Sequence, residues 1–429
     1  MTSLITTLPV TLKPDSARTV IRPFSPGDPS GYVQAGSTRT IRIIDRVLSV
    51  PQADVRAKVD GVRTQLDARE RDPERQFLRR AKEVLGAETS RTVDDPDRLL
   101  LLGAYFSEEF AFESAALFNP SVVRHPDQSG LGEGDTRLVI SLRGIGEGHV
   151  SSLTFRTGVW RADGSLEIDE VAEFATGPEV ERSEMENGQV RVCLDCHGSE
   201  EISETVIFPF MSSQGRGIED VRLVEFTDGD GRRSYRGTFT AFSGMDVRQG
   251  LLQTSDFRSF EARGVEGELY NGKGMALFPR MIGGRYAMLS RQDNESIWLV
   301  FSDDLYAWSG GQRLITPKYP WDFVQMGNCG SPIELDEGWL VLTHGVGAVR
   351  NYCMGAALLD KDDPGKVLAR SAEPFLHPQP DERGGYVPNV VYSCGALLRG
   401  RRLLLPYGVA DQFSEFGVVD VDALLASLS

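Results

Sequence analysis

Apolar residues follow different periods in different parts of the chain. Residues 1 to about 40 are rich in Pro, Gly, Ser and Thr and show little periodicity, so we expect an extended arm that lies on another part of the protein. From about residue 51 apolar residues recur at spacings of 4, 3 and 4, which predicts one apolar stripe on a charged amphipathic helix. The stripe consists of Val55, Val59, Val62 and Leu66.

Two further helices are predicted downstream. Asp72 followed by Pro73 is typical of a helix N-cap and a first helical position, and Gly86 predicts the end of this helix. We expect a third, short helix to begin at Pro96 and to carry the leucine run that follows. The sequence therefore predicts a small helical subdomain over residues 45–112, which packs against the body of the protein or against another subunit.

After about residue 115 short apolar and aromatic runs alternate with turn residues, which predicts β-strands of about five to seven residues. The clearest runs are LVISLRG, SSLTFRTGVW, RRSYRGTFTAF, GRYAMLSR, SIWLVFS and GWLVLTHG. A weak repeat links two of the turns: Ser255-Asp256 with Phe260 recurs 47 residues later as Ser302-Asp303 with Trp308.

This spacing favours a modular all-β fold. A unit of about 40–50 residues with about four strands and an aromatic residue after a turn is typical of a β-propeller blade. About 300 residues would hold five or six such blades, and a pair of β-sandwiches is the alternative that two copies of a motif leave open. We expect an arm over residues 1–44, the helical subdomain over 45–112 and the β-domain over 113–429.

The charge of the chain argues against two classes of partner. The 429 residues carry 46 Lys and Arg against 62 Asp and Glu, a net charge of −16. Such a chain repels phosphate backbones and anionic lipids, so we expect neither nucleic-acid nor membrane-surface binding. We expect a cytoplasmic protein, because the N-terminus lacks a basic segment followed by an apolar one and no apolar run approaches the roughly 18 residues that span a bilayer.

Five cysteines, an odd number in a long chain, fit reduced thiols better than a disulfide framework. Cys193, Cys196 and His197 match the CxxCH pattern of covalent haem attachment. We reject that assignment because such attachment takes place outside the cytoplasm and the stretch is polar and acidic. A redox or zinc site would need further ligands, so we expect a pair of thiols in a loop.

Carboxylates and cations suggest where chemistry takes place. Asp220 and Arg222 stand at the entrance to a predicted strand, where alternation places them on one face and Glu219 on the other. This pattern fits a structural salt bridge, or a carboxylic acid that protonates a leaving oxygen. Lys273, Arg291 and His344 lie on three separate strands, and together they could form a pocket for an anion such as phosphate. Taken singly, each fits a structural role equally well.

The β-domain resembles glycoside hydrolase family 130, the β-mannoside phosphorylases and related β-mannosidases. The resemblance covers about residues 115–425, and residues 1–110 resemble an extension found in part of that family. It rests on IEDVR, LFPRMIGGRYAMLSR, SDDLYAW, GNCGSPIELDEGWLVLTHGV, YCMGAALLDKDDPGKVLARS, GYVPNVVYSCG and LPYGVADQ, in that order. It implies an all-β, five-bladed propeller with the sugar site at its central axis.

The resemblance also implies roles for individual residues. Asp220 corresponds to the catalytic acid, with Val221 where the family has Pro. Asn119 and Arg143 resemble the residues that hold the mannosyl ring in the −1 subsite, and Asp411 resembles the carboxylate that binds the hydroxyls of that ring.

Phosphate binding is implied for Lys273, Arg291 and His344, although the first of these positions departs from the expected Arg. The implied reaction is inverting phosphorolysis of a β-mannoside to α-mannose 1-phosphate, with the acid acting through the 3-hydroxyl of the sugar. The uncommon Glu147 and His149 beside Arg143 are expected to shape the acceptor subsite.

Two other functions compete with phosphorolysis. An inverting hydrolase would need a second carboxylate as base, for which Glu147, Glu268 and Glu295 are candidates. Retention of all three cationic positions favours phosphate over water. A carbohydrate-binding propeller without activity would suit the polar pocket but has no need of the acid and the cations.

We expect no dissociable cofactor and no metal. The sequence contains no nucleotide-binding glycine loop before a helix, no HExxH motif and no carboxylates at metal-ligand spacing. Inorganic phosphate would then be a co-substrate, next to a β-mannoside oligosaccharide. Self-association through the helical subdomain is a further hypothesis, because an amphipathic pair of helices appended to a complete propeller has no obvious core to join.

Overall fold

The structure is a computed structural model of the chain. It describes residues 4–29, 31, 37–66, 70–89, 91–185, 190–209, 217–380 and 384–429, except for the side chains of residues 270 and 271. Part of the predicted arm therefore lies outside the described residues. The chain divides into two compact units. Unit 1 comprises residues 1–16, 112–172 and 178–429, and unit 2 comprises residues 17–111 and 173–177.

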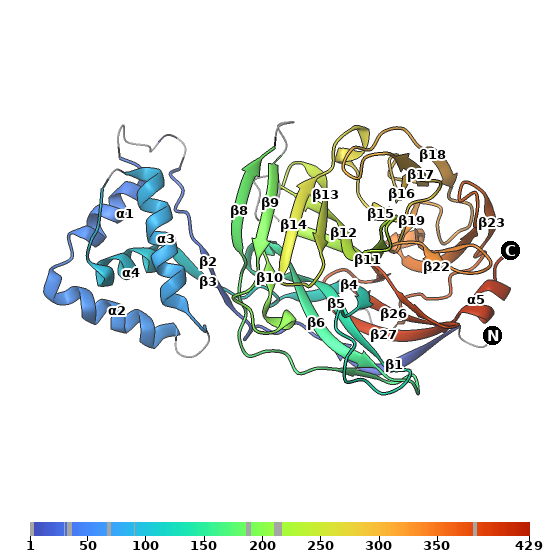
Figure 1. Cartoon of the computed structure of the whole chain (residues 1–429), viewed down its shortest axis with the longest axis horizontal. Helices are drawn as coiled ribbons and strands as arrows, with labels where there is room; N and C mark the ends of the chain where they lie inside the picture. Colours follow the sequence, from blue (N-terminus) through green and yellow to red (C-terminus); the bar gives the residue numbers. More distant parts are fainter. Residues whose placement is uncertain are drawn as a thin grey trace. The chain divides into compact units, whose positions relative to one another are not determined.

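In its described residues, unit 2 contains four helices and a short two-stranded antiparallel sheet (Figure 1). Its elements are α1 (Arg39–Leu48), α2 (Gln52–Leu66), α3 (Pro73–Glu88), α4 (Pro96–Tyr105), β2 (Val20–Pro23) and β3 (Ser107–Phe110). Asp72 caps α3 as predicted, because its carboxylate accepts the backbone N–H of Arg75. Gly86 does not end this helix, which continues to Glu88, since a glycine inside a helix costs only about 1 kcal/mol.

Helix α1 was not predicted, because its apolar residues follow directly on a segment without periodicity. Its Ile44 and Val47 are buried. They belong to a core that the helices of unit 2 build among themselves, with Val55, Phe77 and Leu102 among its members. The assumption that the helices lack a core of their own was therefore wrong, and the argument for self-association that rested on it falls away.

Unit 1 consists of antiparallel sheets that follow one another along the chain (Figure 1). The first group is β4 (Ala116–Arg124), β5 (Thr136–Ile145) and β6 (Ser151–Trp160), with β7 (Leu166–Ile168) and β10 (Val206–Ile207) on β6. The second is β11 (Gly217–Thr227), β12 (Arg233–Phe242), β13 (Val247–Thr254) and β14 (Ser259–Gly264), extended by β9 (Val190–Asp195) and β8 (Glu179–Glu184). One parallel pair, Gly217 with Ser151, links the two groups.

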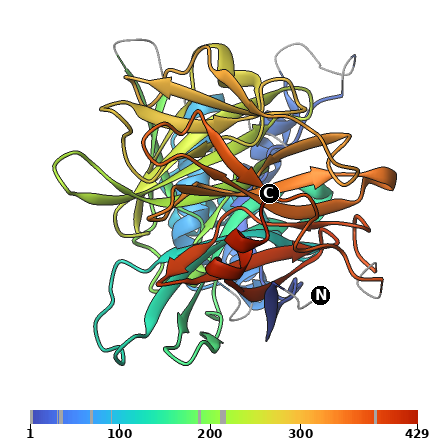
Figure 2. The ribbon, with the colours of Figure 1, turned by 90° about the vertical axis from the view of Figure 1, so that its right-hand side faces the viewer.

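Three more groups complete the described part of unit 1. The third is β15 (Ala276–Leu277), β16 (Tyr286–Ser290), β17 (Ile297–Ser302) and β18 (Gln312–Ile315). The fourth is β19 (Gln325–Asn328), β20 (Ile333–Glu334), β21 (Trp339–Val346), β22 (Tyr352–Leu359) and β23 (Val367–Arg370). The last is β24 (Val391–Tyr392), β25 (Leu397–Arg399), β26 (Arg402–Val409), β27 (Phe413–Asp420) and β1 (Ile5–Leu12), followed by α5 (Val421–Ala426). Figure 1 shows these groups of strands spread around a common centre, and Figure 2 shows the same ribbon turned by 90°.

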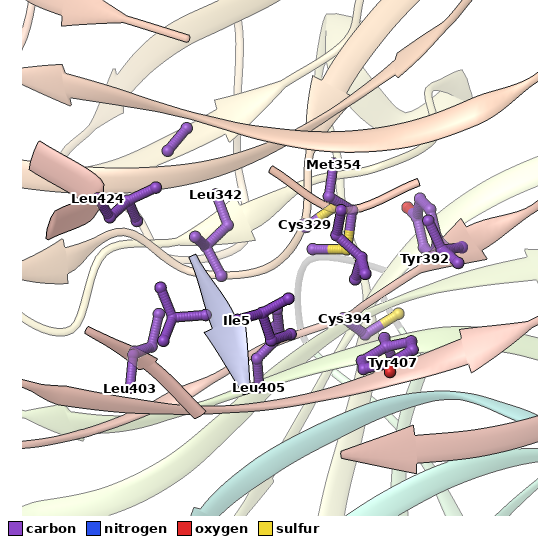
Figure 3. Close-up of a cluster of buried hydrophobic side chains, with 14 of the residues drawn as sticks. Ile5, Cys329, Leu342, Met354, Tyr392, Cys394, Leu403, Leu405, Tyr407 and Leu424 are labelled. Carbon is purple, nitrogen blue, oxygen red and sulfur yellow. The ribbon is translucent and has the colours of Figure 1, made fainter. Parts of the chain in front are cut away.

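Strand β1 joins the two ends of the chain within one sheet. Its residues pair antiparallel with β27, from Ile5 opposite Val419 to Leu12 opposite Ser414. Figure 3 shows Ile5 among the buried side chains of this group, beside Leu403 and Leu405. The start of the predicted arm is thus a strand of the last sheet.

The predicted strands are present, but several are longer than predicted. β5, β6 and β12 each have 10 residues, and β11 has 11. Both faces of these strands carry buried residues, so apolar and polar residues do not alternate along them. Without that alternation the sequence does not show where a strand ends. The two copies of the Ser-Asp motif occupy equivalent turns, one between β13 and β14 and the other between β17 and β18.

Candidate active site

Two of the predicted site residues, Asn119 and Asp220, stand where bulges interrupt a strand. One extra residue bulges β4 between Phe118 and Ser121, and another bulges β11 between Glu219 and Arg222. Asn119 lies in the first bulge at φ 50° and Asp220 in the second at φ 51°. Positive φ is uncommon outside glycine, and bulges of this kind re-aim side chains beside functional sites. The sheets therefore hold both residues in strained conformations.

Arg143 connects the residues of this cluster. Its Nη1 donates to Asp220 Oδ1 at 3.4 Å, its Nη2 to Glu219 Oε1 at 2.7 Å and its Nε to Ser151 Oγ at 2.9 Å. Asn119 Nδ2 also donates to Asp220 Oδ1, at 2.8 Å. Within the described residues, the hydrogen bonds to the Asp220 carboxylate are thus both on one oxygen, Oδ1.

The expectation that Glu219 and Asp220 face opposite ways was wrong. Both carboxylates contact Arg143, because the bulge and the left-handed conformation of Asp220 break the alternation of the strand. Glu219 Oε2 also accepts from Lys273 Nζ at 3.2 Å. Lys273 is thereby brought to the same cluster as the predicted acid.

The expected structural salt bridge between Asp220 and Arg222 is not formed. Arg222 is buried, and its Nη2 donates to the hydroxyl of Tyr392, a residue visible in Figure 3. Its Nε is buried without a hydrogen-bond partner among the described residues. Arg222 and Arg291 thus have no carboxylate in ion-pair contact among the described residues.

Arg291 and His344, two of the three residues of the predicted anion pocket, lie together, whereas Lys273 pairs with Glu219. Arg291 Nη1 is 3.4 Å from His344 Nε2, and Arg291 Nε is buried without a partner among the described residues. His344 packs its ring edge-to-face on Tyr392 with centroids 4.9 Å apart. Burial first, then the charges of Arg291 and Arg222, lower the pKa of His344 well below its usual range. A neutral imidazole can accept from Arg291 and hold its guanidinium in place.

The two aspartates of the site have opposite pKa shifts. Burial tends to raise the pKa of Asp220, but Arg143, Arg222 and the Asn119 hydrogen bond together lower it below its usual value. Burial and the nearby charge of Asp220 raise the pKa of Asp411 to about 6. Asp411 lies in the turn between β26 and β27 at φ 51°.

Asp411 has no hydrogen bond from the described residues, although it is half-buried. A carboxylate that is partly removed from water and has no donors is costly to the free protein. The hydroxyl groups of a sugar could donate the hydrogen bonds that Asp411 lacks, so the environment of Asp411 fits ligand binding better than a structural role.

The candidate bases for a hydrolase are not gathered at this cluster. Glu147, Glu268 and Glu295 are all exposed. Glu268 Oε2 accepts from the backbone N–H of Gly310 at 2.8 Å. In the described residues none of the three contacts Asp220 or its partners. His149 is also exposed, and its ring contacts Tyr386.

The CxxC pair differs from its prediction. Cys193 lies within β9 rather than in a loop, and Cys196 follows directly and is buried in the core of the second group. Burial raises the pKa of the Cys196 thiol to about 12. Within the described ranges, no three or more His, Cys, Asp or Glu side chains gather as a metal site, and no described helix is long and apolar enough to cross a membrane.

Sequence reasoning missed several members of the cluster. Glu219 was placed on the wrong face, and Tyr392, Arg350 and Tyr386 were not considered. The positive charge of Arg350 acts to lower the pKa of Asp411. Arg350 follows a strained turn at Val349. A bulge is not visible in the apolar pattern of a buried strand, so only the resemblance carried a signal for Asn119, whereas the Glu-Asp-Val-Arg run also marked Asp220 as a candidate acid.

Comparison with known proteins identifies relatives for most of unit 1. The family model described as β-1,4-mannooligosaccharide phosphorylase, glycoside hydrolase family 130, matches residues 179–429. A β-1,2-mannobiose phosphorylase of Listeria innocua is 36% identical over 214 residues, which are 48% of this chain and 58% of that protein. A 1,2-β-oligomannan phosphorylase of Thermoanaerobacter is 37% identical over 209 residues, 47% of this chain and 69% of that protein. The chain thus spans little more than half of the first of these relatives.

Solved structures agree with the sequence matches. A β-1,2-mannobiose phosphorylase from Listeria innocua, in complex with β-1,2-mannobiose, has a TM-score of 0.52 and 28% identity, over 74% of this chain and 93% of that chain. A glycoside hydrolase from Bacteroides ovatus shares the fold, with a TM-score of 0.54 and 19% identity over 73% of this chain and 89% of that chain. Asn119, Arg143 and His149 precede the stretch that the family model matches.

Proposed function

Since the chain belongs to glycoside hydrolase family 130, we propose that it is an inverting β-mannoside phosphorylase, which cleaves a β-mannosyl linkage with inorganic phosphate and releases α-mannose 1-phosphate. One observation supports phosphate as the second substrate. Arg222 and Arg291 are cations without a carboxylate partner in the described residues, and each has a buried Nε without a hydrogen bond. Charged guanidinium groups in such a position are matched by an anion.

Asp220 is the proposed general acid. In the free protein its lowered pKa keeps the carboxylate ionised. A phosphate dianion beside Arg222, Arg291 and Lys273 would offset their positive charge and raise the pKa of Asp220, because nearby negative charge favours the protonated form. Asn119 and Arg143 hold Oδ1, so the proton would be carried by Oδ2.

The proposed reaction needs no protein base. A phosphate oxygen attacks the anomeric carbon from the α face as the bond to the leaving oxygen breaks, and Asp220 supplies the proton that this oxygen takes up. The proton on the phosphate then restores the acid. A hydrolase would instead need a carboxylate opposite Asp220 to activate water, and the exposed Glu147, Glu268 and Glu295 do not meet that need.

The sugar would be held by the remaining members of the cluster. Asp411 offers a carboxylate without donors to the hydroxyls of the mannosyl ring, and Arg143 and Asn119 hold Asp220 beside it. We also propose that the five sheet groups of unit 1 are the blades of a closed propeller with this site on its axis. A cytoplasmic location and the lack of a cofactor stay proposals as well.

The test is to incubate the protein with phosphate and β-1,2-mannobiose, β-1,4-mannobiose and mannosyl-glucose in turn, and to identify the sugar phosphate by NMR. The proposal expects α-mannose 1-phosphate from at least one substrate. Free mannose alone would support the hydrolase. Binding of these sugars without any product would support the non-catalytic alternative.

A further inference from the structure

Two exposed rings from distant parts of the sequence meet in unit 1. Tyr386 is 58% exposed, and its hydroxyl lies 3.3 Å from His149 Nδ1. The ring centroids are 5.7 Å apart and the rings are tilted by 41°. Large aromatic residues usually bury such surface. An aromatic pair that stays exposed to solvent therefore suggests a ligand-binding role.

The His149 end of this pair is attached to the acid cluster. His149 belongs to the tight turn between β5 and β6, in which Gly148 has φ 65° and His149 φ 58°. Two residues further on, Ser151 accepts a hydrogen bond from Arg143. Left-handed conformation in a residue other than glycine is strained, and such strain gathers at functional sites.

The Tyr386 end is attached beside Asp411. A Cβ at Gly385 would lie 2.4 Å from Ala410 Cβ, so only glycine permits this close approach. The backbone N–H of Val387 donates to Ala410 O at 3.0 Å. Ala410 directly precedes Asp411, so both rings are fixed within a few residues of groups assigned to the mannosyl ring.

We infer that His149 and Tyr386 form an aromatic platform for the sugar on the acceptor side of the cleaved bond, an aldohexopyranose stacked by its C–H face. The inference rests on the proposed function. The C–H groups of a pyranose carry slight positive charge, which suits the negative face of an aromatic ring. Binding sites combine such apolar walls with a few polar groups that fix orientation. The platform thus selects the acceptor, while Asp220 and the cations carry out the transfer.

The platform is tested in the direction of synthesis, with mannose 1-phosphate as donor and mannose, glucose or β-1,2-mannobiose as acceptor. Tyr386→Ala and His149→Ala should raise the KM for the acceptor by about 3- to 10-fold, as expected from the loss of one aromatic contact. The KM for mannose 1-phosphate should stay within about twofold. Tyr386→Phe keeps the ring and should bind the acceptor nearly as well as the wild type.

Two controls separate the platform from a structural contact. Leu368→Ala removes a similarly exposed apolar side chain from β23 and should leave both KM values unchanged. Equal changes in both KM values in the alanine variants would mean damage to the site and would overturn the platform. An unchanged acceptor KM in active variants would overturn it as well. A wild-type protein without any transfer would instead refute the proposed function.

Discussion

Ionisation of Asp411 should cost unit 1 stability, and Asp411→Asn should recover it. The pKa of Asp411 is raised from 3.8 to about 6 by burial and by the charge of Asp220. A raised carboxyl pKa means that the unfolded chain loses this proton at lower pH than the folded one. The folded state is thus penalised increasingly as pH rises from about 4 to about 6, and the full penalty persists above pH 6.

The size of the effect follows from the shift. A difference of about two pKa units at about 1.4 kcal/mol each gives about 3 kcal/mol at pH 7.5 and about half of that at pH 5. Asn has a similar shape and carries no charge, and Asp411 has no hydrogen bond from the described residues to lose. The variant should therefore be more stable than the wild type at neutral pH, with a gain that shrinks on acidification.

Tryptophan fluorescence during urea unfolding measures this difference in unit 1 alone. All five tryptophans, Trp160, Trp298, Trp308, Trp321 and Trp339, lie in that unit. Asp336→Asn removes a fully exposed carboxylate and is the matched control, for which little change is expected. A stability difference for Asp411→Asn that is the same at pH 7.5 and pH 5 would refute the reasoning, as would a loss of stability at neutral pH.

Three further outcomes follow from the structure. Asp220→Asn should lower kcat by about 10²- to 10⁴-fold and keep sugar binding, as seen by calorimetry with β-1,2-mannobiose; unchanged turnover would rule out Asp220 as the acid. Arg291→Met should raise the KM for phosphate by about 10- to 100-fold and change the KM for the mannoside little, in initial-rate kinetics; equal effects on both substrates would argue against a phosphate contact. Glu113→Gln should destabilise unit 1 by about 3–5 kcal/mol in urea unfolding, because it leaves the buried charge of Arg156 without a partner. Arg156 Nη2 lies 2.7 and 2.9 Å from the two carboxylate oxygens of Glu113. A loss of stability below about 1 kcal/mol would mean that water reaches this pair.

Local signals in the sequence were enough to predict several helices, strands and turns. The Asp72-Pro73 pair locates the start of α3, since the cap and the ring of proline act within one turn of helix. The Ser-Asp motif, which recurs after 47 residues, marks equivalent turns because each copy joins the third and fourth strands of its group. Helix α1 was missed although Ile44, Val47 and Leu48 follow a helical spacing, because residues up to 44 were assigned to the arm.

Residues of the site were harder to derive from periodicity. Glu219 joins Asp220 on Arg143 only because the strand bulges, and a bulge follows from pairing with β12 rather than from the sequence of β11. The contact of Tyr386 with His149 links residues 237 apart in the chain. Such convergence depends on how the sheets are arranged, which a single sequence does not reveal.

The most direct test of the account is turnover of β-1,2-mannobiose with and without inorganic phosphate, with mannose 1-phosphate and free mannose followed together. The account predicts strict dependence on phosphate and equal amounts of mannose 1-phosphate and mannose. Release of mannose alone at the same rate without phosphate would contradict it, because Arg222, Arg291 and Lys273 would then have no anionic nucleophile to hold.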